Sequence, residues 1–411
     1  MNNKRFNLLM IAALLLGAPL GLINSPLIIQ GAEALSTLFI NSLKLISLPM
    51  IFLAIVSTLT RMSSMGEAGA LLKKILKYTV ATTLISATIG MILFLIIRPV
   101  NAGGAVGHVV QVDGSYLSFL MKIIPENPIA PFLENNVLGL AFLASIFSLA
   151  VLKLPQKKGD LLRDLFGALF DTLLKITSAL IQFMPIGILS FTILFFQSMK
   201  GNGDQLKPLF LYALCVIGAN LIQGVIVLPL IVKLRGGSPL KTFRGMLPAL
   251  TMAFFSKSSS ASLPLTLDCA KNRLGISNKV ASFTLPLCSI INMNGCAAFI
   301  LITLFFVCGS QGITFTPLGM IPWVFLASLA AIGNAGVPMG CFFLTTAFLV
   351  GMGVSVEMMG IILPLYSLFD MVETALNVWS DSCITTIVDR EAALPASSKP
   401  LTTKGMKKLQ V

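Results

Sequence analysis

The chain has few charged residues for its length. Lysine, arginine, aspartate and glutamate together make up 11% of its 411 residues, whereas about 25% is usual for a soluble domain. Hydrophobic residues make up 56%, and a chain folded in water could not bury that much apolar surface. The composition therefore predicts a polytopic helical membrane protein and argues against an ordinary soluble enzyme.

Histidine and paired cysteines are also scarce. The one histidine, His108, lies in a glycine-rich stretch over 103–114, which argues against a histidine metal site or a His-based catalytic triad. No Walker or dinucleotide-binding motif occurs, which argues against ATP-driven transport by this chain alone. The cysteines occur singly, without a C-x-x-C pair, so we expect reduced core residues; they are Cys215, Cys269, Cys288, Cys296, Cys308, Cys341 and Cys383.

Acidic residues are outnumbered by basic ones, and the net charge is +13. Such an excess can mark nucleic-acid binding, but the basic residues of membrane proteins gather in cytoplasmic loops. With the N-terminus inside, 22 of the 29 lysines and arginines fall on the cytoplasmic side of the predicted spans. We therefore expect a multi-pass plasma-membrane protein, in a bacterium an inner-membrane protein, with both termini cytoplasmic and no nucleic-acid partner.

Apolar segments long enough to cross a bilayer set the order of the chain. The first follows Lys4 and Arg5 as a signal peptide would, but no A-x-A cleavage site comes after it. Residues 99–135 are interpreted as an extracellular loop and residues 391–411 as a cytoplasmic tail. The first six predicted spans lie at about 6–23, 36–60, 76–98, 136–153, 164–198 and 208–232.

Two later apolar segments are interrupted near their middle by polar or glycine-rich residues, one at about 245–272 and one at about 318–352. Each arm covers about half of a 30 Å hydrocarbon core, so a re-entrant hairpin fits better than a span. Paired interruptions of this kind indicate a midplane binding site built by inverted repeats. With helices at about 280–308 and 361–390, the predicted fold is all-α, with eight transmembrane helices and two re-entrant helical hairpins.

The last predicted helix carries a stripe of polar residues. A helix turns by about 100° per residue, which places the five within about 100° of arc; they are Asp370, Glu373, Thr374, Asn377 and Asp381. A carboxylate at the centre of a bilayer costs about 3 to 15 kcal/mol, so intramembrane acids face a partner, a cavity or an ion. The stripe predicts a cation pathway or a polar substrate pocket. The alternative is a soluble, half-buried helix whose acids meet water.

Amides and hydroxyls elsewhere could complete such a site. Asn292 and Asn294 interrupt the helix over 280–308. They either join helices by hydrogen bonds or, beside two hairpin tips, help to bind a hard monovalent cation. Thr82 and Thr83 could add hydroxyl oxygens, although threonine in a membrane helix often bonds its own backbone.

Ordered motifs extend along almost the whole chain. They are Lys257-Ser-Ser-Ser-Ala-Ser-Leu-Pro264, Ser282-Phe-Thr-Leu-Pro-Leu287 leading to Asn292-Met-Asn-Gly295, Ala335-Gly-Val-Pro338, and Asp370-Met-Val-Glu-Thr-Ala-Leu-Asn377 with Asp381. This series resembles the dicarboxylate/amino acid:cation symporters, the glutamate transporter homologues. The resemblance implies a homotrimer in the bilayer that carries an amino acid or dicarboxylate with two or three sodium ions per protomer, and no enzymatic activity.

The resemblance also implies a division of the chain for elevator-type alternating access. Residues 1–75 and 136–200 supply the scaffold helices one, two, four and five. The third helix at 76–98 and residues 201–390 form the moving transport domain, in which the second hairpin is the gate.

Site roles follow by the same resemblance. Asp370 would bind the substrate's α-ammonium, and Asn377 its α-carboxylate together with backbone amides at Ser259 and Val337; Cys296, Glu373 and Thr374 complete the substrate-binding set. One sodium ion would be held by Asp381 with carbonyls at Cys288, Asn292 and Asn377. The other two would use carbonyls at Ile290, Met293, Ala331 and Asn334, and the residues Thr82, Thr83, Asn292 and Asn294.

Three positions depart from the family pattern. Glu373 stands where members that carry acidic substrates have an arginine, and an acid cannot replace a bidentate Arg–carboxylate contact. Cys296 replaces a threonine, and Asn294 replaces an aspartate of the third sodium site. We therefore expect a neutral or cationic substrate side chain, or a Glu373 that is protonated or paired with Lys257. Burial disfavours a charged carboxyl, so proton coupling through Glu373 is a further hypothesis.

Other functions remain open from the residues alone. Lys257 beside Ser258 and Ser259 is compatible with a Ser/Lys hydrolase, but adjacent residues point apart on regular structure and the polar stripe stays unexplained. An acid-lined cation or anion channel is the stronger alternative. An exchanger of neutral amino acids is another.

Overall fold

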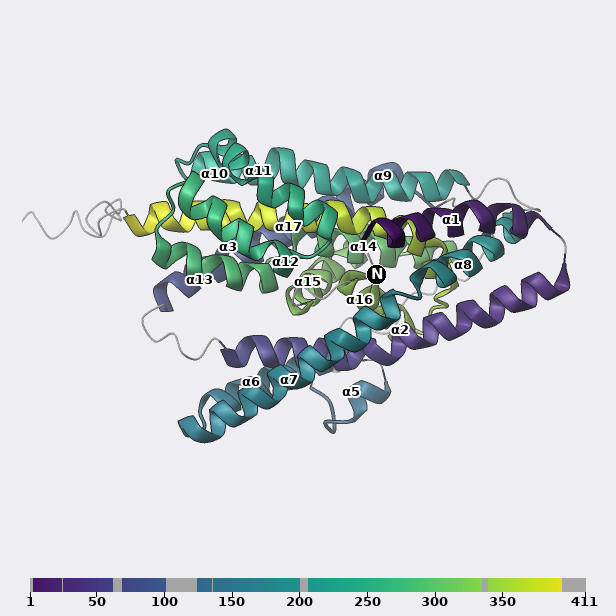
Figure 1. The fold of residues 1–411 in the computed structure, drawn as a ribbon, viewed down its shortest axis with the longest axis horizontal. Helices are drawn as coiled ribbons and strands as arrows, with labels where there is room; N and C mark the ends of the chain where they lie inside the picture. Colours follow the sequence, from purple (N-terminus) through teal and green to yellow (C-terminus); the bar gives the residue numbers. More distant parts are fainter. Residues whose placement is uncertain are drawn as a thin grey trace, which may run out of the picture.

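The computed structural model describes residues 3–23, 25–61, 69–100, 124–134, 136–199, 206–334 and 339–393. This part of the chain is helical and contains no strand. Most of its helices lie alongside one another, near the long axis of the molecule (Figure 1). The prediction of an all-helical membrane chain is confirmed at this level.

The first half of the chain forms long helices and one short one. Among them α1 packs along α8, and α2 packs against α6, α7 and α8. The bounds are α1 (Asn3–Leu22), α2 (Pro26–Arg61), α3 (Gly69–Ile97), α5 (Ala130–Leu133), α6 (Val137–Leu152), α7 (Gln156–Ile181) and α8 (Met184–Met199).

One predicted span is divided. We expected a continuous helix over 164–198, but α7 ends at Ile181 and α8 begins at Met184. The backbone N–H groups of Gln182 and Phe183 bond to carbonyls three residues earlier, which tightens the final turn. Pro185 then lies in the first turn of α8. Proline suits a helix start, and its missing N–H disfavours continuation of a preceding helix, so Pro185 favours the restart at this position.

The second half of the chain begins with a helix that contains a π-helical turn, α9 (Leu206–Ile222), η3 (Gln223–Val227) and α10 (Leu228–Leu234). The elements α11 (Pro239–Ser256) and α12 (Ser259–Asp268), with η4 (Cys269–Arg273), fall on the first predicted hairpin and pack against each other. The later elements are α13 (Asn278–Ile291), α14 (Asn294–Ser310), α15 (Pro317–Gly333), α16 (Gly340–Gly351) and α17 (Glu357–Ala393).

Among the described residues, four helical stretches are long and apolar enough to cross a membrane by length and composition: 71–97, 206–234, 278–310 and 357–392. The outer helices also expose large apolar side chains, among them Leu15 (70% exposed), Phe210 (69%) and Val225 (69%). Apolar surface of this extent is stable against lipid but costly in water. The exposed faces therefore agree with the membrane assignment.

The core that positions the site is formed around α14 and α17. Each residue of α14 from Asn294 to Cys308 is buried. The helix α17, yellow in Figure 1, passes through the middle of the molecule and contacts α3, α11, α13 and α14. The polar stripe of α17 therefore faces protein instead of the outer surface.

Gly295 allows α14 to approach α17 closely, and we expect Gly295→Ala to reduce the free energy of unfolding by about 1 to 3 kcal/mol, as overpacking of a core does. A Cβ at this position would lie 2.8 Å from both Asn220 Oδ1 and Glu373 Cα. Thermal unfolding of the purified protein in detergent measures the change. Gly31→Ala is the matched control, because a Cβ there meets no described atom within 4 Å. Equal midpoints for Gly295→Ala and the unmodified chain would contradict the close approach.

Candidate binding site for cations and an amino acid

A chain of side-chain amides leads to the carboxyl group of Asp381. The amide of Asn292 donates to Asp381 Oδ1 at 2.8 Å, and the amide of Asn294 donates to Asn292 Oδ1 at 2.8 Å. The amide of Gln223 in turn donates to Asn294 Oδ1 at 2.7 Å. All four side chains are buried. No ion pair reaches Asp381 within the described part of the chain, so a charged Asp381 requires a cation from outside the protein.

Hydroxyl groups of α3 lie beside this network. Thr82 Oγ1 lies 3.4 Å from Asn292 Oδ1 and also donates to the carbonyl of Tyr78. Ser86 Oγ donates to the carbonyl of Asn294 at 2.7 Å. Thr83 bonds the carbonyl of Thr79 at 2.7 Å, the local bond expected of a threonine in a membrane helix. The structure therefore brings Thr82, Asn292 and Asn294 together, with Thr83 one residue away and turned to its own backbone.

The turn between α13 and α14 contains two of the predicted carbonyl ligands, Asn292 and Met293, and its backbone is not helical. Asn292 and Met293 have φ values of −101° and −106° with ψ near 70°, so the helix is interrupted there. Carbonyls at such a break can face a bound cation. The amide N–H of Asn292 bonds the carbonyl of Cys288. Ile290 belongs to the last turn of α13.

The remaining predicted carbonyl ligands come from the end of α15, which packs against α13 and α14. Ala331 and Asn334 are both buried, and Asn334 N–H bonds the carbonyl of Ala331 at 3.1 Å. Oδ1 of Asn334 lies 1.6 Å from the place of a Cβ on Gly340, so a larger residue at 340 would displace the Asn334 side chain. Val337, predicted to offer a backbone amide, lies outside the described residues.

Asn377 connects α17 to the start of α14. Its Oδ1 accepts from the backbone N–H of Gly295 at 2.9 Å. Its Nδ2 lies 3.4 Å from Met293 Sδ and 3.6 Å from Cys296 Sγ. These contacts hold the Asn377 amide in one orientation. A carboxylate that replaced either sulfur contact would accept a hydrogen bond from Nδ2.

Asp370 and Thr374 lie one turn apart on α17, and the Thr374 hydroxyl donates to the Asp370 carboxyl. Asp370 is half-buried, the most accessible acid of the stripe, whereas Thr374 is buried. Ser259 is the first residue of α12, after the N-cap Ser258, and is 6% exposed. A helix start presents unpaired backbone N–H groups, which suit a carboxylate.

Lys257 does not pair with Glu373. Lys257 ends α11 in the left-handed region, with φ 52°, and its Nζ donates to Ser367 Oγ at 2.7 Å. Glu373 is 1% exposed, and neither of its carboxylate oxygens has a hydrogen-bond partner among the described residues. Of the two arrangements expected for Glu373, the pairing with Lys257 is therefore wrong. A carboxylate oxygen of Glu373 instead lies within 4.8 Å of the sulfur atoms of Cys296 and Cys341.

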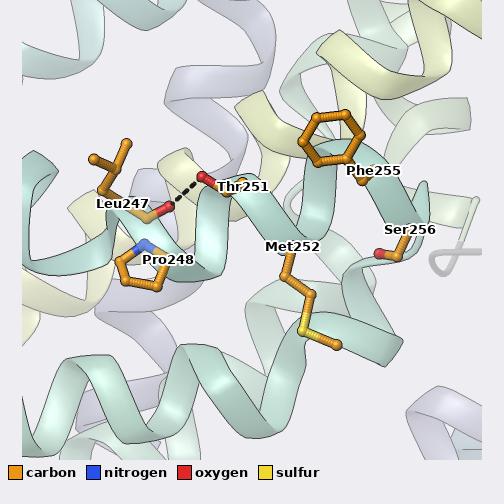
Figure 2. A pocket seen from close by; sticks show the side chains of 6 residues that line it. All are labelled: Leu247, Pro248, Thr251, Met252, Phe255 and Ser256. Carbon is orange, nitrogen blue, oxygen red and sulfur yellow. Dashed lines mark hydrogen bonds between the residues drawn. The ribbon is translucent and has the colours of Figure 1, made fainter.

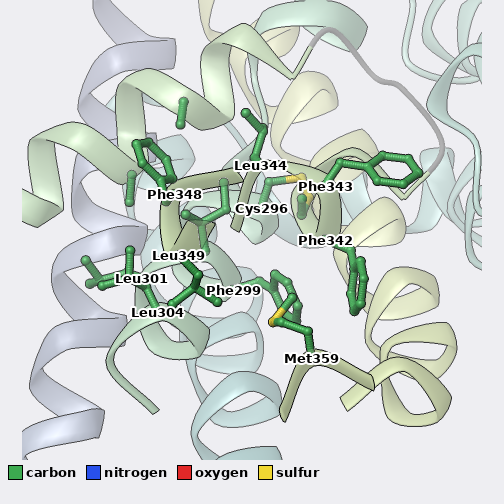
Figure 3. Close-up of a cluster of buried hydrophobic side chains, with 14 of the residues drawn as sticks. Cys296, Phe299, Leu301, Leu304, Phe342, Phe343, Leu344, Phe348, Leu349 and Met359 are labelled. Atoms are coloured by element: carbon green, nitrogen blue, oxygen red, sulfur yellow. A yellow bond between two sulfur atoms is a disulfide. The ribbon is translucent and has the colours of Figure 1, made fainter. Parts of the chain in front are cut away.

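Cys296 and Cys341 are joined as a disulfide, with their Cα atoms 5.4 Å apart. The expectation that every cysteine is reduced is thus wrong for this pair; the other described cysteines are free and buried. Sequence spacing could not indicate the pairing, because the two lie 45 residues apart and meet only where α16 packs on α14. Figure 3 shows the bond within a cluster of buried apolar side chains that includes Phe299 and Phe342.

Some contributors were missed from the sequence. Gln223, Ser86 and Ser380 all bond Asn294, and Gln223 also donates to the carbonyl of Thr82 at 3.0 Å. Gln223 opens the π-helical turn η3, and π-bulges are frequent at functional sites. A lone glutamine within the apolar run 208–232 was the available signal.

A surface pocket elsewhere does not belong to this site. It is lined by one face of α11, from Leu247 to Ser256 (Figure 2). The Thr251 hydroxyl in it is bonded to the Leu247 carbonyl, and the lining contains no charged side chain. An open apolar face of this kind fits lipid or a packing partner better than a polar substrate.

Comparison with known proteins gives one family across most of the chain. The model of the sodium:dicarboxylate symporter family matches residues 6–391. A putative sodium-dependent excitatory amino acid transporter, glt-4 of Caenorhabditis elegans, is 28% identical over 86% of this chain and 81% of its own. The neutral amino acid transporter B(0) of Oryctolagus cuniculus is 28% identical over 84% and 71%. Excitatory amino acid transporter 3 of Mus musculus is 26% identical over 92% and 84%.

Proposed function

Since the chain belongs to the sodium:dicarboxylate symporter family, we propose that it is a secondary active transporter that carries an amino acid together with sodium ions. Members of this family are membrane transporters, so the chain is not an enzyme. The observation that carries the proposal is the buried Asp381 with its amide network, which lacks a basic partner in the described residues. Sodium is then part of the cargo and supplies the missing charge.

The first candidate sodium site is centred on the Asp381 carboxyl group. Asp381, with carbonyls of Cys288, Asn292 and Asn377, offers the hard oxygen ligands that an alkali cation prefers. A second candidate site consists of Thr82, Thr83, Asn292 and Asn294. We expect it to bind sodium more weakly, because Asn294 carries no charge and its Oδ1 already accepts a hydrogen bond from Gln223. The carbonyls of Ile290, Met293, Ala331 and Asn334 form a third. We therefore infer two strong sodium sites and one weak one per protomer.

The substrate is inferred from the other half of the stripe. Asp370 takes the α-ammonium and Asn377 the α-carboxylate, with backbone amides at Ser259 and Val337. Glu373 lies where the substrate's side chain would end. An acidic side chain would face a carboxyl there, whereas a neutral or cationic side chain would not be repelled. We infer a neutral or cationic amino acid, and the relatives named above include a neutral amino acid transporter as well as excitatory ones.

Movement is inferred from the packing. The helices α1, α2, α6, α7 and α8 pack mainly on one another, and α3 packs with α9, α14, α15 and α17. This grouping supports a scaffold of residues 1–75 and 136–200 and a transport domain of 76–98 and 201–390, working as an elevator in a homotrimer. We also propose a plasma-membrane location with both termini cytoplasmic.

Ligand-dependent thermal stability tests this function without a transport assay. A ligand that binds only the folded state adds about 2.7 kcal/mol to the free energy of unfolding at 100 times its Kd, by mass action. The unfolding midpoint rises as a result. We expect alanine, serine or lysine to raise the midpoint in sodium and not in potassium, and aspartate to have a smaller effect. The alternative outcome, equal stabilisation in both salts or by no amino acid, would remove sodium-coupled amino acid binding.

Proton coupling through Glu373 predicts a pH-dependent uptake. A protonated Glu373 presents no charge to a neutral substrate, so an inward proton gradient should increase uptake at constant sodium. Glu373→Gln, which mimics the protonated side chain, should make the rate independent of pH. The rates are measured in proteoliposomes at several external pH values. A pH response that persists in Glu373→Gln would assign the proton to another group.

A further inference from the structure

The cluster formed by Cys296, Cys341 and Glu373 combines two sulfur atoms and a carboxylate from three different helices. Cys296 is in the first turn of α14, Cys341 in the first turn of α16 and Glu373 in α17. One ligand atom from each lies within 4.8 Å of the other two. The three side chains are 3%, 2% and 1% exposed, respectively. We propose that, with the two thiols reduced, this cluster binds a divalent d¹⁰ cation such as Zn²⁺ or Cd²⁺.

The unpartnered carboxylate is the first reason. Both oxygens of Glu373 are buried and accept no hydrogen bond from any described residue. The basic side chain of the neighbouring hairpin, Lys257, is bonded to Ser367 instead. A buried carboxylate without a donor is costly unless it is protonated or neutralised by a cation. The space next to it contains sulfur, which favours a metal ion over an organic cation.

The type of donor identifies the class of ion. Thiolates bind soft and borderline cations such as Zn²⁺ and Cd²⁺ and are poor ligands for Na⁺, Mg²⁺ or Ca²⁺. Two thiolates and one carboxylate carry a formal charge of −3, so a divalent ion leaves −1 in place of −3. Binding displaces the two thiol protons to solvent. Three protein ligands leave a fourth tetrahedral position for water.

Amide groups around the sulfurs support ligation. Asn334 Nδ2 lies 3.4 Å from Cys296 Sγ and 3.6 Å from Cys341 Sγ, and Asn377 Nδ2 lies 3.6 Å from Cys296 Sγ. Hydrogen-bond donors of this kind fix the orientation of metal ligands and stabilise thiolate charge. The same two sulfur atoms are joined in the disulfide, so the oxidised and metal-bound forms exclude each other.

The consequence for transport rests on the proposed function. A metal ion at this position would connect α16, in the second hairpin, to α14 and α17 and would occupy the space assigned to the substrate side chain. We expect Zn²⁺ or Cd²⁺ to inhibit uptake in competition with substrate, and only in the reduced protein.

Metal binding is tested on the full-length protein in detergent, without substrate or a sodium gradient. The disulfide is reduced, the reductant is removed and Cd²⁺ is added while ultraviolet thiolate-to-cadmium absorption is recorded. We expect one ion per protomer, competition by Zn²⁺ and none by Mg²⁺. Cys296→Ser or Cys341→Ser should abolish the absorption, and Glu373→Gln should weaken binding by about tenfold, as the loss of one ligand-sphere contact does.

Controls separate this cluster from other thiols. Cys308→Ser removes another buried cysteine of α14 and should leave the titration unchanged. Cys341→Ala is tested as well, in case the serine variant fails to fold, and its thermal midpoint is measured to show that it is folded. Protein reoxidised with diamide should show no absorption. An unchanged titration in folded Cys341→Ala, or no absorption in wild-type protein whose thiols titrate as free, would overturn the site.

The outcome is independent of the transport proposal. Metal binding with no amino acid transport would retain the site and reject the proposed function. Sodium-coupled transport by a protein that binds no Cd²⁺ would reject the site and retain the function.

Discussion

Asp370→Asn is expected to abolish amino acid uptake. Removing one partner of a desolvated charge pair costs about 3 to 5 kcal/mol, because the other charge stays buried and unpaired. That cost corresponds to a loss of about 10² to 4 × 10³ in affinity, since 1.4 kcal/mol is tenfold. Asparagine keeps the size of the side chain and can still accept the hydrogen bond from Thr374. Folding should therefore be retained while the α-ammonium loses its counter-charge.

The measurement is saturable uptake of labelled amino acid into proteoliposomes, with the thermal midpoint recorded for each variant. Asp389→Asn is a matched control on the same helix: Asp389 accepts hydrogen bonds from Ser277 at the end of α17 and is distant from the stripe in sequence. Its uptake should match that of the unmodified protein. Normal kinetics in Asp370→Asn would show that this carboxyl does not bind the substrate.

Asp381→Asn is expected to raise the sodium concentration needed for half-maximal uptake by at least tenfold. The substitution removes the one carboxylate of the proposed ion site, and the Asn292 amide that donates to Oδ1 at 2.8 Å can still bond an amide oxygen. The variant therefore loses the negative charge that attracts sodium but keeps the hydrogen bond from Asn292. At saturating sodium, part of the rate should return.

The sodium dependence is measured at a fixed amino acid concentration, with choline replacing sodium. Ser382→Ala is the control, because the hydroxyl of this neighbouring residue donates to the Val378 carbonyl of its own helix at 2.7 Å. It should leave the half-maximal sodium concentration unchanged. The same sodium dependence in Asp381→Asn as in the unmodified protein would remove this residue from the ion site.

The helical polar stripe could be predicted from sequence because its period is set by one helix. Asp370, Glu373 and Asp381 needed no tertiary information to be placed on one face. The interruption at Asn292–Gly295 was likewise visible as a polar run within an apolar helix. The structure adds that the Asn292 and Asp381 side chains meet. Their roles toward substrate and sodium stay predictions.

Features that depend on contacts between distant helices could not be predicted in this way. Gln223 bonds Asn294 across 71 residues, and nothing local distinguishes it from a glutamine that joins helices. The Cys296–Cys341 pair depends on α16 packing against α14. The predicted span over 164–198 also combined α7 and α8, because the residues on both sides of Pro185 are apolar and hydropathy does not detect a break in the helix.

Sodium-driven accumulation tests the central claim most directly. Proteoliposomes with sodium outside and potassium inside are supplied with labelled alanine, serine or lysine, and the internal concentration is followed with and without the sodium gradient. The account predicts saturable uptake to an internal concentration above the external one, which collapses when the gradient is removed. Flux that never exceeds equilibrium, or that increases linearly with substrate, would contradict a sodium-coupled carrier.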